Sequence, residues 1–301
     1  MDLFDETKPS FSGHETFPLR HGWLEKAYYA VNSSEKNPFT EDLAIADFGV
    51  GKNMVNAIKH WAIATGFLKI EQDNKFRVSD YARKLIEHKT DPYLENPDTM
   101  WKIHYELAKN PRNTTVHWLF SHFNENVFDR YLLINRLQDF IKQHEQKIPA
   151  EKTMVADISV TLANYCSNSK SIKNDDDIGS PLSELKLISR AEDNRYVFNF
   201  GTKHTLSSEL FLECLVNYLE NESIRLKQNQ NTIKFETLLH DAFTPGRIFL
   251  LGSAELTDRL EKIEEISDGA LVWSETAGIN EVRKTARYDP TKLTGKWMRG
   301  Q

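Results

Sequence analysis

Apolar residues recur at helical spacing in the first part of the chain. They fall three or four positions apart over 19–31, with Pro18 at the first helical position, and the same spacing returns over 52–65. Gly66 supplies a C-terminal stop for the second run. Between the two runs, polar loop residues precede a shorter helical pattern over 41–48. The pattern therefore predicts two helices separated by a short one.

The next residues change to the two-residue alternation that is typical of β-strands. Phe67–Glu71 and Lys75–Val78 flank the turn sequence Gln72-Asp73-Asn74, which predicts a hairpin. A further helix is expected over 80–88. The order helix, short helix, turn, helix, hairpin, helix is that of a winged helix-turn-helix domain, which we place at about 19–90.

The rest of the chain contains a helical region and then a second hairpin followed by a helix. A linker over 91–97 leads into helical patterns, and a polar stretch then precedes a hairpin over 188–200 and a helix over 207–220. We expect a mainly α fold with small β-hairpins (α+β), in which winged helix-turn-helix domains are joined by a helical region. The expected parts are 1–90 (N-terminal motif and winged domain), 98–167 (helical middle domain) and 178–301 (C-terminal winged-helix-like region with a basic tail).

Charge is unevenly distributed along the 301 residues. The net charge is −6, which excludes a protein coated uniformly with positive charge. Residues 51–90 contain eight Lys/Arg against four Asp/Glu, and 277–301 contain six against two, whereas 191–270 contain eight against fourteen. The acidic stretch is usually just a solvated face, and the alternative is that it repels nucleic acid and leaves binding to the basic ends.

Targeting and redox features point to one compartment. No apolar run approaches the ~18 residues of a membrane helix, and the acidic N-terminus lacks the pattern of a signal peptide. Cys166 and Cys214 make neither a disulfide framework nor a CxxC metal site. We expect a cytoplasmic protein with no membrane partner.

The sequence Gly49-Val50-Gly51-Lys52 superficially resembles a phosphate-binding loop. A P-loop requires a hydroxyl after its lysine and an earlier glycine, but Asn53 takes the place of the hydroxyl and the earlier glycine is missing. The tight turn of a helix-turn-helix explains these residues better.

The helix after this turn has a polar face that is suited to DNA. Asparagine can pair with adenine, and lysine can contact phosphate or guanine. The alternative is a solvated face of a winged domain that binds protein. The predicted DNA-binding residues are Lys52, Asn53, Asn56, Lys59 and His60 on the helix, with Lys75 and Arg77 on the hairpin.

The segment from His14 to His21 concentrates polar chemistry in eight residues. His14, Glu15 and Arg20 could perform acid–base work and hold a phosphate, and we take them as the catalytic candidates. The segment is not an HExxH zinc motif, because His21 lies too far along and Pro18 interrupts. The alternative is a polar lead-in whose side chains hydrogen-bond helix ends. No metal ligands are assigned.

Two further groups are better explained by folding than by chemistry. Asp175-Asp176-Asp177 with Glu184 and Lys186 imitates a magnesium-dependent nuclease pattern, but that pattern needs its last two residues on a strand, and a helix is predicted here. A set of aromatic and histidine residues is expected in the core: Trp101, His104, Tyr105, His117, Trp118, His122 and Phe123.

Two N-terminal motifs carry a resemblance to a known family. The residues are Phe11-Ser12-Gly13-His14-Glu15-Thr16-Phe17-Pro18-Leu19-Arg20-His21-Gly22-Trp23-Leu24 and Phe48-Gly49-Val50-Gly51-Lys52-Asn53-Met54-Val55 with Ile58 and Trp61. They resemble a bacterial family of formerly unknown function that is found in DNA phosphorothioation gene clusters. Asn113–Phe120 is also similar. The best-known setting of the family is the single-stranded, Ssp-type system, whose SspB-like component is described as DNA-nicking.

The resemblance implies a role in DNA modification and antiphage defence. The protein would act on DNA beside a cysteine desulfurase, an ATPase and a sulfur-activating ATP pyrophosphatase. It would nick one strand so that sulfur can replace a non-bridging phosphate oxygen. The resemblance assigns no catalytic residues, so the roles of His14 (general acid or base), Glu15 (orienting group or metal ligand) and Arg20 (phosphate holder) rest on their clustering.

Three hypotheses follow. The first is a strand-nicking endonuclease, for which a divalent metal, magnesium or manganese, is the expected cofactor. The second is a non-enzymatic winged-helix adaptor or regulator that binds DNA and recruits the modification proteins. The third is a protein scaffold that never touches DNA.

Overall fold

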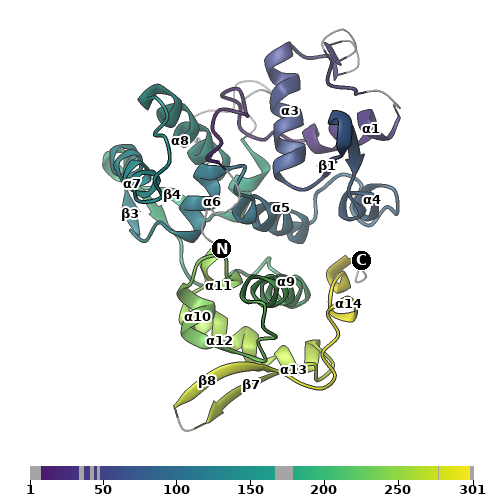
Figure 1. The fold of residues 1–301 in the computed structure, drawn as a ribbon, viewed down its shortest axis with the longest axis vertical. Helices are drawn as coiled ribbons and strands as arrows, with labels where there is room; N and C mark the ends of the chain where they lie inside the picture. Colours follow the sequence, from purple (N-terminus) through teal and green to yellow (C-terminus); the bar gives the residue numbers. More distant parts are fainter. Residues whose placement is uncertain are drawn as a thin grey trace. The chain divides into compact units, whose positions relative to one another are not determined.

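The computed structural model describes residues 8–33, 37–40, 44–45, 48–166, 179–276 and 278–298. These residues are mainly helical with small antiparallel sheets, which confirms the predicted α+β class (Figure 1). The chain divides into a larger unit, Asp2–Leu119 with Phe123–Phe198, and a smaller unit, Phe120–His122 with Asn199–Gln301. This division differs from the three expected parts, which stay a prediction.

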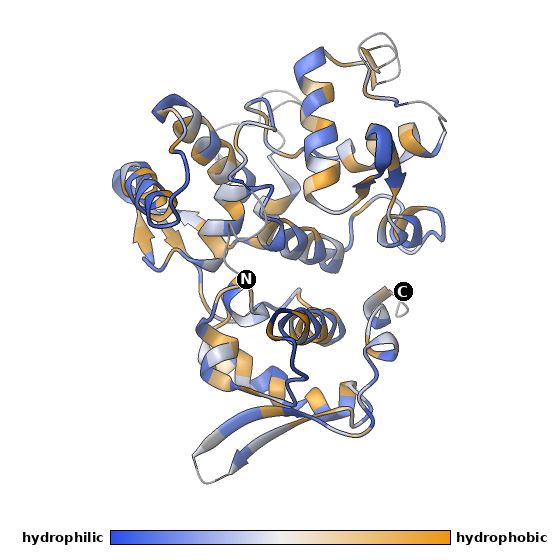
Figure 2. Cartoon of the chain, in the orientation of Figure 1, coloured by the Kyte–Doolittle hydropathy of each residue, from blue (hydrophilic) through white to orange (hydrophobic). Residues whose placement is uncertain are grey.

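The larger unit begins with the predicted helices and hairpin. Helix α1 spans Trp23–Asn32 and packs on α3, Lys52–Ala64. Helix α1 begins later than predicted, and Pro18 lies outside it. The reason is Gly22, whose φ of 75° takes the chain through the left-handed region before the first helical turn. Polar and apolar residues alternate around α3 as expected for an amphipathic helix (Figure 2).

The first hairpin forms where the alternation predicted it. Strands β1, Leu68–Ile70, and β2, Phe76–Val78, are antiparallel, and Ser79 then caps helix α4, Asp80–Ile86, by accepting the N–H of Ala82. Of the short helix expected over 41–48, Ala44, Ile45 and Phe48 are helical, and the rest lies outside the described residues.

The middle of the chain is helical, as predicted, with one strand that the sequence did not reveal. Its elements are α5 (Pro97–Lys109), α6 (Thr114–Ser121), β3 (Val127–Phe128), α7 (Arg130–Gln143) and α8 (Glu151–Tyr165). The expected aromatic core is confirmed by the burial of Trp101, Tyr105, Trp118 and Phe123. His104 also lies in this core, with its Nδ1 2.8 Å from the Tyr165 hydroxyl.

The second predicted hairpin joins this helical region. After a short 3₁₀ helix, Pro181–Leu185, strands β4, Ile188–Arg190, and β5, Tyr196–Phe198, pair with each other. Strand β5 also pairs with β3, so the sheet order is β3-β5-β4. The hairpin therefore belongs to the larger unit, whereas the helix that follows it begins the smaller one.

The smaller unit is built around one long helix, α9, which spans Ser208–Leu226. It ends six residues beyond the predicted end at 220. The described residues 278–298, from the segment expected as a basic tail, contain a strand and short helices. Strand β8 pairs with the whole of β7, and Trp297 donates its indole N–H to Glu213 of α9 at 3.0 Å. The sheet order is β6-β8-β7. The other elements are β6 (Thr232–Lys234), α10 (Phe235–His240), α11 (Pro245–Ile248), α12 (Ser253–Glu261), α13 (Ile263–Ile266), β7 (Leu271–Thr276), β8 (Ile279–Lys284) and α14 (Pro290–Leu293).

Among the described residues, no helix combines the length and the apolar character that crossing a bilayer requires.

Candidate nucleic-acid interface

His14 is buried, and its ring is held at both nitrogens. Its Nδ1 accepts the backbone N–H of Thr16 at 3.2 Å, so Nε2 carries the proton and donates to Asp157 Oδ1 at 2.8 Å. Asp157 also accepts the N–H of Ser12 and the hydroxyl of Thr115. This network fastens the loop over 8–17 to α6 and α8, with the His14 ring bound to a side chain inside α8 and not to a helix end.

Glu15 connects the same loop to α3. Glu15 and Thr16 have φ values of 48° and 66°, so two successive non-glycine residues occupy the left-handed region. Glu15 Oε1 accepts the side-chain N–H of Asn56 at 3.2 Å. The catalytic candidate Glu15 and the DNA-binding candidate Asn56 are therefore direct partners.

His60 packs against the start of this turn. A Cβ on Gly13 would collide with His60 Nδ1, so only glycine fits there. The Nε2 atom of His60 is buried without a hydrogen-bond partner among the described residues. Burial, together with the nearby ring of His14, lowers the pKa of His60 to about 4, and the imidazole is therefore neutral at pH 7.

A hollow of about 360 Å³ lies between the loop and α3, and we call it the loop–α3 hollow. Across the parts of the chain that the structure describes, neither Lys59 nor Arg112 forms an ion pair. Because an unpaired cation can neutralise a phosphate, the hollow is suited to an anionic backbone. Its polar lining residues are Ser10, Glu15, Asn56, Lys59, His60 and Arg112.

Arg112 was missed by the sequence analysis. It follows Pro111 in the turn between α5 and α6, far along the chain from Lys59, and no local motif marks it. Only the tertiary fold places the two cations on one hollow.

A second hollow, of about 290 Å³, also has Asn56 in its lining. We call it the turn hollow, because Phe39 from a turn lines it together with Ala44 and Ile45 of the short helical segment and Lys52 of α3. Ile45 is 50% exposed. Asn56 thus borders both a polar hollow and a largely apolar one.

The remaining DNA-binding candidates are less uniform. Lys52 and Asn53 are exposed at the N-terminus of α3, and Lys75 is exposed on the hairpin. Arg77 already pairs with Glu71 at 2.8 Å and lies 3.9 Å from Asp80, which reduces its attraction for phosphate. The structure therefore gathers the α3 candidates and gives the hairpin a weaker positive charge.

Arg20 lies apart from the other catalytic candidates. Its guanidinium lies over the rings of Phe17 and Trp23, 5.8 and 5.7 Å from their centroids, and it lines neither hollow.

No metal centre emerges from the described ranges, which hold no group of three or more His, Cys, Asp or Glu arranged for a metal ion. Glu184 lies in the 3₁₀ helix and Lys186 follows it with a φ of 50°, so neither is on a strand. Asp175, Asp176 and Asp177 fall outside the described residues.

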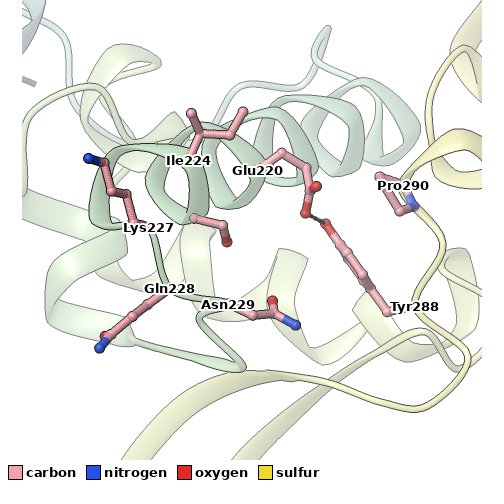
Figure 3. Close-up of a pocket in the computed structure, with 8 residues that line it drawn as sticks. Glu220, Ile224, Lys227, Gln228, Asn229, Tyr288 and Pro290 are labelled. Atoms are coloured by element: carbon pink, nitrogen blue, oxygen red, sulfur yellow. Dashed lines mark hydrogen bonds between the residues drawn. The ribbon is translucent and has the colours of Figure 1, made fainter.

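The smaller unit has a hollow of its own, of about 440 Å³, at the end of α9 (Figure 3). Glu220 and Tyr288 point toward one another there, and the Tyr288 hydroxyl donates to Glu220 Oε1 at 2.9 Å. Lys284 Nζ lies 3.1 Å from the same oxygen. Apart from Lys227, the polar lining groups are uncharged or already paired, so this hollow is less suited to DNA than the loop–α3 hollow.

Comparison with known proteins assigns the chain to a family. The sequence profile of the family described as "Protein of unknown function (DUF4007)" matches residues 11–297. The chain belongs to the DUF4007 family. The match includes the loop, α3 and the smaller unit, so the DUF4007 assignment covers nearly the whole chain. No curated protein matches the chain.

Two solved structures share the DUF4007 chain's fold. One is described as "Magnesium ion-bound SspB crystal structure", with a TM-score of 0.83, and the other as "SspB crystal structure", with 0.81. Each is 23% identical and covers 97% of this chain and 89% of the solved one. The chain is therefore similar in fold to SspB.

Proposed function

We propose that the protein binds DNA as a component of a phosphorothioate modification and antiphage defence system. The observation that carries the proposal is the pair of cations, Lys59 and Arg112, which flank the loop–α3 hollow beside Asn56 without carboxylate partners among the described residues. The fold shared with SspB supports the setting. A cysteine desulfurase, an ATPase and a sulfur-activating ATP pyrophosphatase are its proposed partners.

The proposed DNA-reading element is α3, within a winged helix-turn-helix arrangement. Helix α3 follows a glycine-containing turn and precedes the β1–β2 hairpin, which is the position of a recognition helix. Recognition helices contact bases through their N-terminal residues, and here Lys52 and Asn53 are exposed. Lys59 and Arg112 would then hold the backbone.

Strand nicking is the proposed activity, and the non-enzymatic adaptor is the second candidate. Nicking is supported by the neutral imidazole of His60 in a hollow suited to phosphate. The adaptor is supported by His14, whose two nitrogens are both occupied within the fold. Magnesium is bound in one SspB structure. Because the described residues of this chain offer no three-residue metal group, we derive no step through a metal.

Salt-dependent binding to a labelled DNA duplex tests the proposal. Each of Lys59→Ala and Arg112→Ala should reduce the slope of log K against log salt by about 0.9 and weaken binding about tenfold at 0.1 M salt. Lys142→Ala, which removes an exposed lysine from α7, is the matched control and should bind like the wild type. Unchanged binding in the variant that carries both substitutions would mean that other residues hold the DNA, whereas no binding by wild type would favour the scaffold hypothesis.

The same proteins then decide between the two candidate functions. Supercoiled plasmid is incubated with wild type, with magnesium or manganese added, alone and with the partner proteins. Nicking that is lost in Lys59→Ala and Arg112→Ala supports the endonuclease. Salt-dependent binding without nicking in either condition supports the adaptor.

A further inference from the structure

We propose that Glu15 is a positioning residue that fixes the side-chain amide of Asn56, and that Asn56 is the specificity-determining residue that reads an adenine. The inference deepens the proposed DNA binding and rests on it. It differs from the catalytic role that clustering suggested for Glu15.

The turn that carries Glu15 is built to hold that side chain in one place. Glu15 and Thr16 both lie in the left-handed region, which costs energy for residues other than glycine. The His14 ring accepts the Thr16 N–H and binds Asp157, so the turn is anchored to α8. Gly13 allows the close approach to His60 that brings the turn against α3.

The carboxylate of Glu15 selects one orientation of the Asn56 amide. An ionised carboxylate only accepts hydrogen bonds, whereas an amide has a donor side and an acceptor side of almost equal shape. The contact of 3.2 Å between Glu15 Oε1 and Asn56 Nδ2 therefore fixes which side of the amide faces the loop. Without Glu15, the two orientations would be close in energy.

The donor and acceptor on Asn56 that Glu15 does not use are complementary to the edge of adenine. One N–H of Nδ2 is used by Glu15, and the second N–H and Oδ1 remain. An N–H and a carbonyl oxygen side by side complement N7 and the N6 amino group of adenine. Asn56 also borders the turn hollow, where Ile45 and Phe39 provide apolar contacts for a base.

The surrounding charges allow a carboxylate at a DNA surface. Glu15 would repel phosphate if it were alone, but Lys59 and Arg112 line the same hollow. The balance of one carboxylate against two cations keeps the hollow attractive to the backbone, while Glu15 acts only on Asn56.

The test is selection from a randomised duplex library, followed by sequencing of the bound DNA. Wild type should prefer adenine at one position by about tenfold or more. Asn56→Ala and Glu15→Ala should both lose that preference at the same position and keep the wild-type salt slope. Glu15→Gln, which can accept or donate, should retain part of the preference. Glu95→Ala, which removes an exposed carboxylate from the loop before α5, should behave as wild type.

Each other outcome has a defined meaning. If Glu15→Ala keeps the adenine preference, the positioning role is wrong, whether the variant loses nicking or only melts earlier. If wild type binds with no preference, the specificity proposal fails and DNA binding stands. If neither wild type nor the Lys59 and Arg112 variants bind DNA, both the specificity proposal and the proposed DNA-binding function fail.

Discussion

His14 shows how the chemistry of one residue depends on contacts that lie far away in sequence. Its place in a dense polar motif makes it a natural catalytic candidate. The residue that defines its role, Asp157, lies 143 positions away, and no local pattern connects the two. The sequence could predict the motif as a candidate site. It could not predict that His14 would bind Asp157 inside the fold while Glu15 would bind Asn56 on α3.

Asp157 should therefore contribute strongly to stability. Replacing it by alanine removes the partner of the His14 ring and of two other donors in a buried place. We expect Asp157→Ala to lower the free energy of unfolding by about 3 kcal/mol, because buried donors are left unpaired. Urea denaturation followed by circular dichroism measures this.

An exposed carboxylate on the neighbouring helix provides the comparison. Asp139→Ala on α7 should change stability by less than about 0.5 kcal/mol. Equal effects of the two substitutions would show that the Asp157 network does not hold the loop.

At the scale of elements, the sequence predicted the helices and hairpins whose formation depends on neighbouring residues. Helices α3 and α4 and both predicted hairpins follow from periodicity and turn residues. Strand β3 has two residues, too few for an alternation to show, and it forms because β5 offers an edge. The β7–β8 hairpin was missed because its polar outer residues resemble a basic tail.

The two predicted hairpins share one turn geometry, which gives a paired prediction. Asp73 and Asp193 have φ/ψ of 61°/29° and 60°/30°, in the left-handed region. Replacing either with glycine should stabilise the protein by up to about 1 kcal/mol, because glycine adopts this conformation without strain. Thermal or urea unfolding of each variant measures the change.

The preceding residues serve as controls with the opposite sign. Gln72 and Glu192 do not have positive φ values. Gln72→Gly and Glu192→Gly should therefore destabilise by about 0.5–1 kcal/mol, since glycine loses more backbone entropy on folding. The idea is rejected if all four variants change stability in the same direction.

At the scale of the whole molecule, the two three-stranded sheets follow the same connection order. In β3-β5-β4 and in β6-β8-β7, the first strand in sequence lies beside the last, and helices connect the first strand to the second. This similarity rests on edge strands of two and three residues, so the sequence could not reveal it. Because β5 pairs with β3, the hairpin stays with the larger unit, and the chain divides near 199 and not in the polar stretch before 179.

The pH dependence of stability is a property of the folded chain to which one half-buried carboxyl, Glu25, contributes. Burial on α1, with a smaller contribution from Asp91, raises the pKa of Glu25 from 4.5 to about 7. Between these values the folded state binds more protons than the unfolded state, so this group makes stability fall as pH rises. The penalty is complete above about pH 7 and absent below about pH 4.5.

Replacing Glu25 by glutamine should remove this penalty. We expect Glu25→Gln to exceed wild type by about 1–3 kcal/mol at pH 8 and to match it at pH 4.5. His60, whose pKa is lowered to about 4, acts in the opposite direction below pH 6.5, so only the difference between variant and wild type isolates Glu25. Urea unfolding across this range measures it, with the exposed Glu95→Gln as control. A difference that does not change with pH would mean that Glu25 titrates normally and that α1 is stabilised by packing alone.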